Sequence, residues 1–277
     1  MKSIHTLAIT AGHQRALRIL LIGSGGNGSA VLAGLPYLHH AMLAWGFRSG
    51  LEVTVVDGDT VSPTNCVRQP FGASDIGLNK ATVLVSRLNL FHGLAWRAVS
   101  VPFTRELSLG FSYDRAVDFV ISCVDTSAAR RAMDEAFNSA SGSWSKVHYW
   151  LDLGNNAGDG QFVLGQPLNA ANRRSRSRLR TVAELFPSIV DPTLGEDPAP
   201  SCSAAEALDR QEPFINNVLA TSALSMLTRL IRYGEIAYHG AFYNSASGRG
   251  IPLAVDPDAW ERSRRRAKRA QAEAVAA

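Results

Sequence analysis

The sequence is poor in cysteine. Only Cys66, Cys123 and Cys202 occur in 277 residues, and no two of them form a CxxC pair. This pattern argues against a zinc site built from cysteine pairs. An odd and sparse set of cysteines also does not suit a secreted disulfide scaffold, so we expect the protein to be cytoplasmic.

Long apolar runs are also missing. No segment approaches the roughly 18 to 20 uninterrupted apolar residues that a membrane helix needs, and residues 1–15 lack the apolar core of a signal peptide. Hydrophobic residues nevertheless make up 46% of the chain. That share is enough for a packed core, and the length suits one large α/β domain or two small ones.

The excess of positive charge is small and localised. The formal net charge is 28 − 24 = +4, and the tail 257–277 carries six basic residues against three acids. A second basic segment, residues 173–180, has no interleaved aromatic residues, so it does not predict a surface on which the bases of single-stranded nucleic acid would stack. Both segments favour a solvated surface over an acidic partner or nucleic acid.

Strand-like and helix-like segments alternate along the chain, which predicts an α/β fold with a largely parallel, doubly wound sheet covered on both faces. We expect a strand at residues 160–165 that could pair with the strand before it. Residues 241–255 suggest a closing hairpin, and residues 5–10 suggest a short edge strand. The main expected strands are 18–23, 51–57, 117–125 and 146–155, and the expected helices are 29–43 (disturbed by Pro36), 79–91, 127–140 and 212–233.

The alternation stops between residues 166 and 201, where basic and Pro/Gly-rich stretches follow one another. We interpret this segment as a mobile crossover loop inside one domain, because it does not resemble a linker between independent units. The expected organisation is a domain of residues 1–256 and a basic C-terminal tail of residues 257–277.

A glycine motif follows the first long strand. GSGGNG places Gly23, Gly25 and Gly28 in GxGxxG spacing between a strand and a helix, where backbone N–H groups and a helix N-terminus bind phosphates. The alternative is a tight structural turn. Asp57, at the end of the next strand, suits a ribose, but it lies 57 − 28 = 29 residues beyond Gly28, and an insertion around 35–50 would explain the excess over about 20.

Hydrogen-bonding and charged side chains follow this acid closely. Asn65, Arg68 and Gln69 come within twelve residues of Asp57 (69 − 57), and Lys80 opens the next expected helix. A dehydrogenase has little use for a fixed guanidinium here, whereas an enzyme that cleaves ATP uses such cations to neutralise the phosphates. The alternative is a solvated face with ordinary surface cations.

Asp125 ends the apolar strand 117–125. Ligands of doubly wound sheets bind at the carboxyl ends of the strands, and a carboxylate there can hold Mg²⁺. Asp125 could equally be the N-cap of the following helix. For Cys123 and Cys66 we expect packing roles, because buried cysteines are commonly inert.

Five motifs in order carry a family resemblance. They are GSGGNG, DGDTV, TNCVRQ, DIGLNKA and CVD. With them the chain resembles the ThiF/MoeB superfamily of ubiquitin-activating-type adenylating enzymes, and within it the ThiF-like proteins of the bacterial PRTRC system. The resemblance covers residues 15–165 and, more loosely, 200–232.

The resemblance implies a Rossmann-like adenylation fold extended by antiparallel strands. It also implies a homodimer and a reaction in which ATP and Mg²⁺ adenylate the C-terminal carboxylate of a small ubiquitin-like protein of the β-grasp fold. Carried over by position, the nucleotide would be held by Gly23, Gly25, Gly26, Gly28, Asp57, Asp59 and Gln69, the triphosphate by Asn65, Arg68 and Lys80, and Mg²⁺ by Asp125.

The resemblance also directs attention to Cys202, which precedes the helix expected at 212–233 as a nucleophilic cysteine does in some relatives. A thiolate there would take the acyl group as a thioester. The alternatives are a packing or inert cysteine. Two other functions stay open: adenylation of a peptide or a tRNA base without a cysteine step, and a nucleotide-binding scaffold of a mobile-element operon without chemistry.

Overall fold

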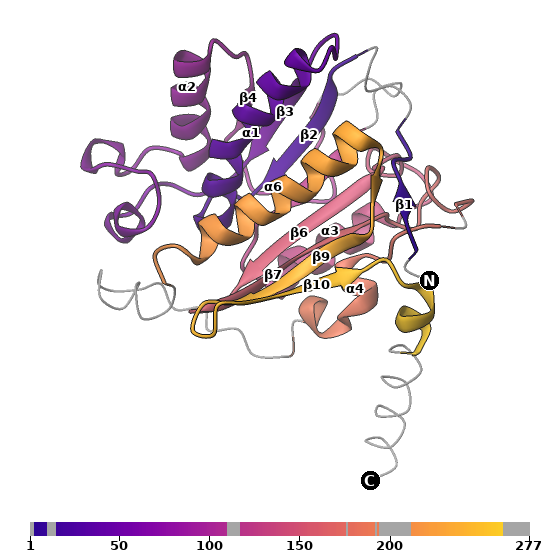
Figure 1. Ribbon diagram of the computed structural model, residues 1–277. Coiled ribbons are helices and arrows are strands. Elements are labelled where there is room, and N and C mark those ends of the chain that lie inside the picture. Colours follow the sequence, from indigo (N-terminus) through magenta and orange to yellow (C-terminus); the bar gives the residue numbers. More distant parts are fainter. Residues whose placement is uncertain are drawn as a thin grey trace.

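The computed structural model describes residues 3–9, 15–109, 117–175, 177–191, 193 and 212–262. Its centre is a sheet of eight strands in the order β10-β9-β7-β6-β5-β2-β3-β4 (Figure 1). The strands are β2 (Leu17–Ile22), β3 (Leu51–Val56), β4 (Arg97–Val99), β5 (Phe119–Ser122), β6 (Tyr149–Asn155), β7 (Asp159–Gly165), β9 (Tyr238–Asn244) and β10 (Arg249–Ala254).

The sheet has a parallel half and an antiparallel half. All neighbouring pairs from β4 through β3, β2 and β5 to β6 are parallel. The pairs β6–β7, β7–β9 and β9–β10 are antiparallel. The structure therefore confirms the predicted α/β fold class: a mostly parallel, Rossmann-like sheet extended by antiparallel strands, including the predicted pairing of 160–165 and the closing hairpin.

Both faces of the sheet are covered, and the alternation within β2 shows how. Ile19 and Leu21 pack into one core and Leu20 and Ile22 into another, because successive strand residues point to opposite faces. The first core lies under α1 (Gly26–Ala44), α2 (Lys80–His92) and α6 (Ile215–Tyr233), and the second under α3 (Ser127–Phe137) and α4 (Val182–Leu185). Figure 1 shows α6 crossing the sheet over β6 and β7.

The long first helix explains the spacing between the glycine motif and Asp57. α1 has 19 residues and continues through the buried Pro36 without a break, although we expected Pro36 to disturb it. The turn after α1 then leads into β3. No separate inserted element lies between Gly28 and Asp57 in this described stretch, so helix length alone accounts for the additional residues.

Three boundaries or elements differ from the prediction. The strand expected at 5–10 is β1 (His5–Thr6), and it pairs with β8 (Glu235–Ile236) outside the main sheet. Strand β5 ends at Ser122 rather than at residue 125. Part of the expected mobile loop 166–201 is packed: α4 contacts β7, and the 3₁₀ turn η3 (Pro187–Val190) contacts α3. The division into residues 1–256 and a tail stays a prediction.

Candidate active site

One cavity of about 610 Å³ lies at the carboxyl ends of the parallel strands. β2 is its central strand: the chain continues from β2 to β3 and β4 on one side and then returns to β5 on the other side of β2. This reversal is the place where open α/β sheets bind ligands. The cavity is lined by residues at the ends of β2, β3, β5 and β6 and by the first turns of the helices that follow or cross them.

The glycine motif forms the turn from β2 into α1. Gly23 has φ of 84°, and an added Cβ would lie 2.7 Å from the Cys123 carbonyl oxygen. A Cβ on Gly28 would collide with the Gly23 carbonyl. The N-cap residue Gly25 has no side chain, and the first turn of α1 holds no acid. No acidic side chain and no side-chain cap therefore competes for the N-terminal amides of α1, as a phosphate site requires.

Asp57 joins the glycine turn to the loop after β3. Its Oδ2 accepts hydrogen bonds from the Ser24 backbone N–H at 2.6 Å and the Ser24 hydroxyl at 2.7 Å. Its Oδ1 accepts one from the Asp59 N–H at 2.8 Å. The carboxylate lines the cavity while it fixes both loops. Because Oδ1 accepts only one of these bonds and has a further lone pair, the carboxylate can also accept a ribose hydroxyl.

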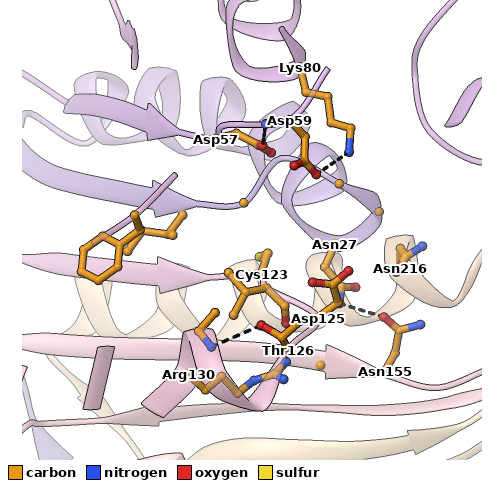
Figure 2. A pocket seen from close by; sticks show the side chains of 18 of the residues that line it. Asn27, Asp57, Asp59, Lys80, Cys123, Asp125, Thr126, Arg130, Asn155 and Asn216 are labelled. Carbon is orange, nitrogen blue, oxygen red and sulfur yellow. Dashed lines mark hydrogen bonds and ion pairs between the residues drawn. The ribbon is translucent and has the colours of Figure 1, made fainter. Parts of the chain in front are cut away.

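Lys80 and Asp59 meet at the cavity wall. The Lys80 Nζ lies 2.9 Å from Asp59 Oδ2 (Figure 2). Asn79 caps α2 by accepting from the Thr82 N–H, and its Nδ2 donates to the carbonyls of Asp57 and Asp59. This capping residue thus ties the start of α2, and with it the ammonium group, to the loop that carries Asp57.

Arg68 and Asn65 come from the 3₁₀ turn η1 (Pro63–Val67) and its end. The Asn65 Oδ1 accepts from the Ser62 N–H, so this amide shapes the turn. Arg68 lines the cavity; burial lowers its pKa, and the charge of Asp125 opposes that change. A guanidinium stays protonated under all such shifts. It therefore brings a permanent positive charge to the cavity.

Gln69 and Cys66 flank Arg68. Gln69 is buried at the cavity wall, and its backbone N–H donates to the Asn65 carbonyl. Cys66 is half-buried and packs against the core, as we expected. Cys123 also packs against the core, as we expected, although it follows the end of β5 and also lines the cavity. Burial raises the pKa of its thiol well above the ordinary range.

Asp125 lies at the carboxyl end of β5 and lines the same cavity. Thr126 caps α3: its hydroxyl accepts from the Ala129 N–H at 3.2 Å. The alternative in which Asp125 caps this helix is therefore wrong. Within the described ranges, no three His, Cys, Asp or Glu side chains gather as a metal cluster. One carboxylate still fits Mg²⁺, which commonly takes one or two carboxylates together with phosphate oxygens and water.

Residues 11–251 match the ThiF family. This chain belongs to that family. Two solved structures have similar folds: PaaA, with TM-score 0.56 and 12% identity over 86% of this chain, and Escherichia coli MccB with ATP, with TM-score 0.53 and 15% identity over 91%. The chain covers 64% of PaaA and 68% of MccB. A search of curated proteins found no match.

Beneath the cavity of this ThiF-family protein lies a buried ion pair that the sequence did not reveal. The Arg130 Nε lies 3.2 Å from both carboxylate oxygens of Asp152, and its Nη2 donates to the Val124 carbonyl at 2.6 Å. The Ser122 hydroxyl donates to Asp152 at 2.6 Å. This network holds the ends of β5 and β6 and the start of α3 together, and Arg130 also lines the cavity.

Several carboxamides line the end of the cavity nearest β6, among them Asn27, Asn155 and Asn216 (Figure 2). The Asn27 Nδ2 donates to the Asn155 Oδ1 at 2.9 Å. We had not singled out any of the three. Asn27 stands at a variable position of the GxGxxG pattern, and the sequence does not show that this polar side chain is buried.

Cys202, the predicted nucleophile, lies outside the described residues, so its position relative to the cavity is not part of the description. All other predicted site residues line or adjoin the cavity. Among the residues that the structure describes, every helix is too short or too polar to span a bilayer.

Proposed function

We propose that this ThiF-family protein uses ATP to adenylate the C-terminal carboxylate of a small ubiquitin-like protein. The observation that carries the proposal is the gathering of Asp57, the glycine turn, Arg68, Lys80 and Asp125 around one cavity at the strand-order reversal. In this arrangement Asp57 accepts the ribose, and the turn and the N-terminus of α1 receive the phosphates.

The proposed chemistry is displacement at the α-phosphorus. A carboxylate oxygen forms a bond to phosphorus, the bond to the bridging oxygen breaks, and pyrophosphate leaves with its electron pair. Arg68 and Lys80 counter the negative charge that develops on the leaving group. Asp125 would hold Mg²⁺, whose charge shields the phosphate oxygens from the incoming carboxylate.

A second step belongs to the same proposal. The thiolate of Cys202 attacks the acyl carbonyl, a thioester forms, and AMP leaves with the electrons of the broken bond. We also propose a cytoplasmic homodimer and kinship with the PRTRC-system proteins, on the resemblance of the five motifs alone.

The proposal is tested by ATP–pyrophosphate exchange with candidate small proteins encoded nearby. Exchange that depends on a partner protein and disappears in Arg68→Ala supports adenylation. ATP binding without exchange toward any carboxylate refutes it and favours a scaffold. A thiol-sensitive conjugate that is lost in Cys202→Ser supports the thioester step, whereas its absence with exchange intact removes Cys202 from the mechanism.

A further inference from the structure

The end of the cavity nearest β6 holds buried hydrogen-bonding atoms that have no partner among the described residues. Both carboxamide atoms of Asn216 and the Oδ1 of Asn27 accept or donate no hydrogen bond within the described part of the chain. Asn216 is only 1% exposed and Asn27 8%. Asn155, by contrast, uses its Oδ1 for Asn27 and its Nδ2 for the Asn156 carbonyl.

Such atoms are unusual in a folded protein. Leaving a buried polar group unpaired costs on the order of 1–3 kcal/mol, and most are paired with protein or water. The packing of Asn216 is nevertheless close: a Cβ on Gly26 would lie 2.5 Å from its Nδ2. The carboxamide therefore rests directly on the glycine turn, beside the N-terminus of α1, and faces the cavity.

The unpaired atoms select the chemistry of their ligand. They comprise one NH₂ donor and two carbonyl acceptors, and they carry no charge. Phosphate and carboxylate oxygens offer lone pairs only, so the two acceptors would repel them. An extended peptide residue presents its own N–H and C=O on the same side, as in a hydrogen-bonded strand pair. One carboxamide can accept from that N–H and donate to that C=O.

We propose that Asn216 and Asn27 form a backbone subsite that holds the last residues of the acyl substrate in an extended conformation. Asn216 makes the paired contacts to one residue, and the Asn27 Oδ1 accepts a further N–H. The enzyme thereby selects peptidyl carboxylates over acids that lack a neighbouring peptide group. This inference rests on the proposed adenylation and adds the recognition of its acyl substrate.

Adenine also presents a donor beside an acceptor, but the sheet places it elsewhere. Asp57 follows β3, Asn155 ends β6, and β2 and β5 lie between these strands. A ribose on Asp57 therefore directs the base away from Asn216, toward the cavity wall that contains Pro102 and Phe103. The end of the cavity that contains Asn27 and Asn216 is therefore available to the acyl substrate.

The test is ATP–pyrophosphate exchange driven by a pool of acetylated hexapeptides of random sequence with free C-terminal carboxylates. We expect Asn216→Ala and the isosteric Asn216→Asp to raise the KM for the pool about tenfold, the equivalent of one to two lost hydrogen bonds, and to leave the KM for ATP unchanged. Asn217→Ala is the matched control, because Asn217 is the exposed neighbour on the same helix turn.

A second measurement uses the best peptide of the pool. Each of its last two peptide N–H groups is replaced in turn by an ester oxygen. One of these esters should be a poor substrate for the native protein. Asn216→Ala should not make it a poorer one, because the hydrogen bond that the substitution removes is already absent in the ester. Thermal unfolding should show Asn216→Ala to be as stable as the native protein, because an unpaired group is removed.

Several results would overturn the subsite. They are an unchanged KM for the pool in both Asn216 variants, a raised KM for ATP instead, and exchange with acetate or benzoate as fast as with the peptides. Failure of the proposed function has a different signature. In that case the native protein shows no exchange with any peptide, simple acid or candidate ubiquitin-like protein, and adenylation is refuted together with the subsite.

Discussion

The two ends of the cavity are built in opposite ways. At the β3 end, Asp57 accepts three hydrogen bonds and Lys80 is paired with Asp59, so charged groups are held in place by the protein itself. At the β6 end, Asn27 and Asn216 are neutral, buried and incompletely paired. The first end is arranged for a ligand of high charge, and the second depends on a ligand to complete its hydrogen bonds.

This difference has an energetic reason. Phosphates bring strong charge, and fixed cations and amides bind them without reorganisation when their own partners hold them. A peptide backbone brings only dipoles, which bind well where competing water is excluded and the partner atoms are otherwise unpaired. The polar cavity thus combines two kinds of recognition within about 610 Å³.

We expect the largest loss of stability and function when the buried Arg130–Asp152 ion pair is broken. Arg130→Ala leaves the buried Asp152 without its partner and should lower the free energy of unfolding by about 3–5 kcal/mol. Both ends of the cavity should then lose function together, since β5, β6 and α3 separate. Denaturant unfolding measures the loss.

The matched control for that variant is Arg131→Ala. Arg131 is the neighbouring residue on α3 and forms an exposed pair with Glu135, so its removal should cost no more than about 1 kcal/mol. Equal stabilities of the two variants would show that the buried pair contributes no more than a surface pair.

Arg68→Ala should affect the charged end of the cavity and leave the neutral end unchanged. It removes a guanidinium from the charged end and should reduce the rate of pyrophosphate exchange by about 10²–10³-fold, the range seen when one transition-state donor is lost. The KM for peptides should not change. A variant that retains most of its exchange rate would exclude Arg68 from the chemistry.

The sequence indicated the charged end better than the neutral end. Asp57, Arg68 and Lys80 stand beside motifs whose order and spacing are informative, because charged groups in loops have few structural roles. Asn216 lies one position from Ile215 in an apolar stripe, and nothing in a single sequence distinguishes its burial from that of an ordinary helix residue. That no described residue pairs with its carboxamide is visible only in three dimensions.

The fold followed a similar rule. Strands β2, β3, β5 and β6 are largely apolar, and the sequence predicts each of them to within a few residues, since buried parallel strands favour such composition. The Arg130–Asp152 pair was missed, because an arginine beside Arg131 in a polar helix resembles a surface residue. The segment around α4 was interpreted as a loop, since its packing against β7 depends on long-range contacts that local composition does not encode.

A smaller effect is expected from Lys80→Met at the charged end. Asp59 is 72% exposed, so the ion pair itself contributes little to stability. The KM for ATP should rise about tenfold, as for the loss of one hydrogen bond to a charged group. An increase in the KM for peptides instead would show that Lys80 contacts the acyl substrate and that the two ends are not separate.

The smallest effect should come from Asn155→Ala at the neutral end. The substitution removes the Asn155 Oδ1, which accepts a hydrogen bond from the Asn27 Nδ2 at 2.9 Å. Asn27 then loses its fixed orientation but keeps its own Oδ1 for the substrate. The KM for peptides should therefore rise only about three- to fivefold, and stability should fall by about 1 kcal/mol. Steady-state exchange at saturating ATP measures the first change and denaturant unfolding the second.

If Asn155→Ala instead weakens ATP binding as much as Lys80→Met does, phosphates reach the β6 end, and the division of the cavity into a charged and a neutral half is wrong.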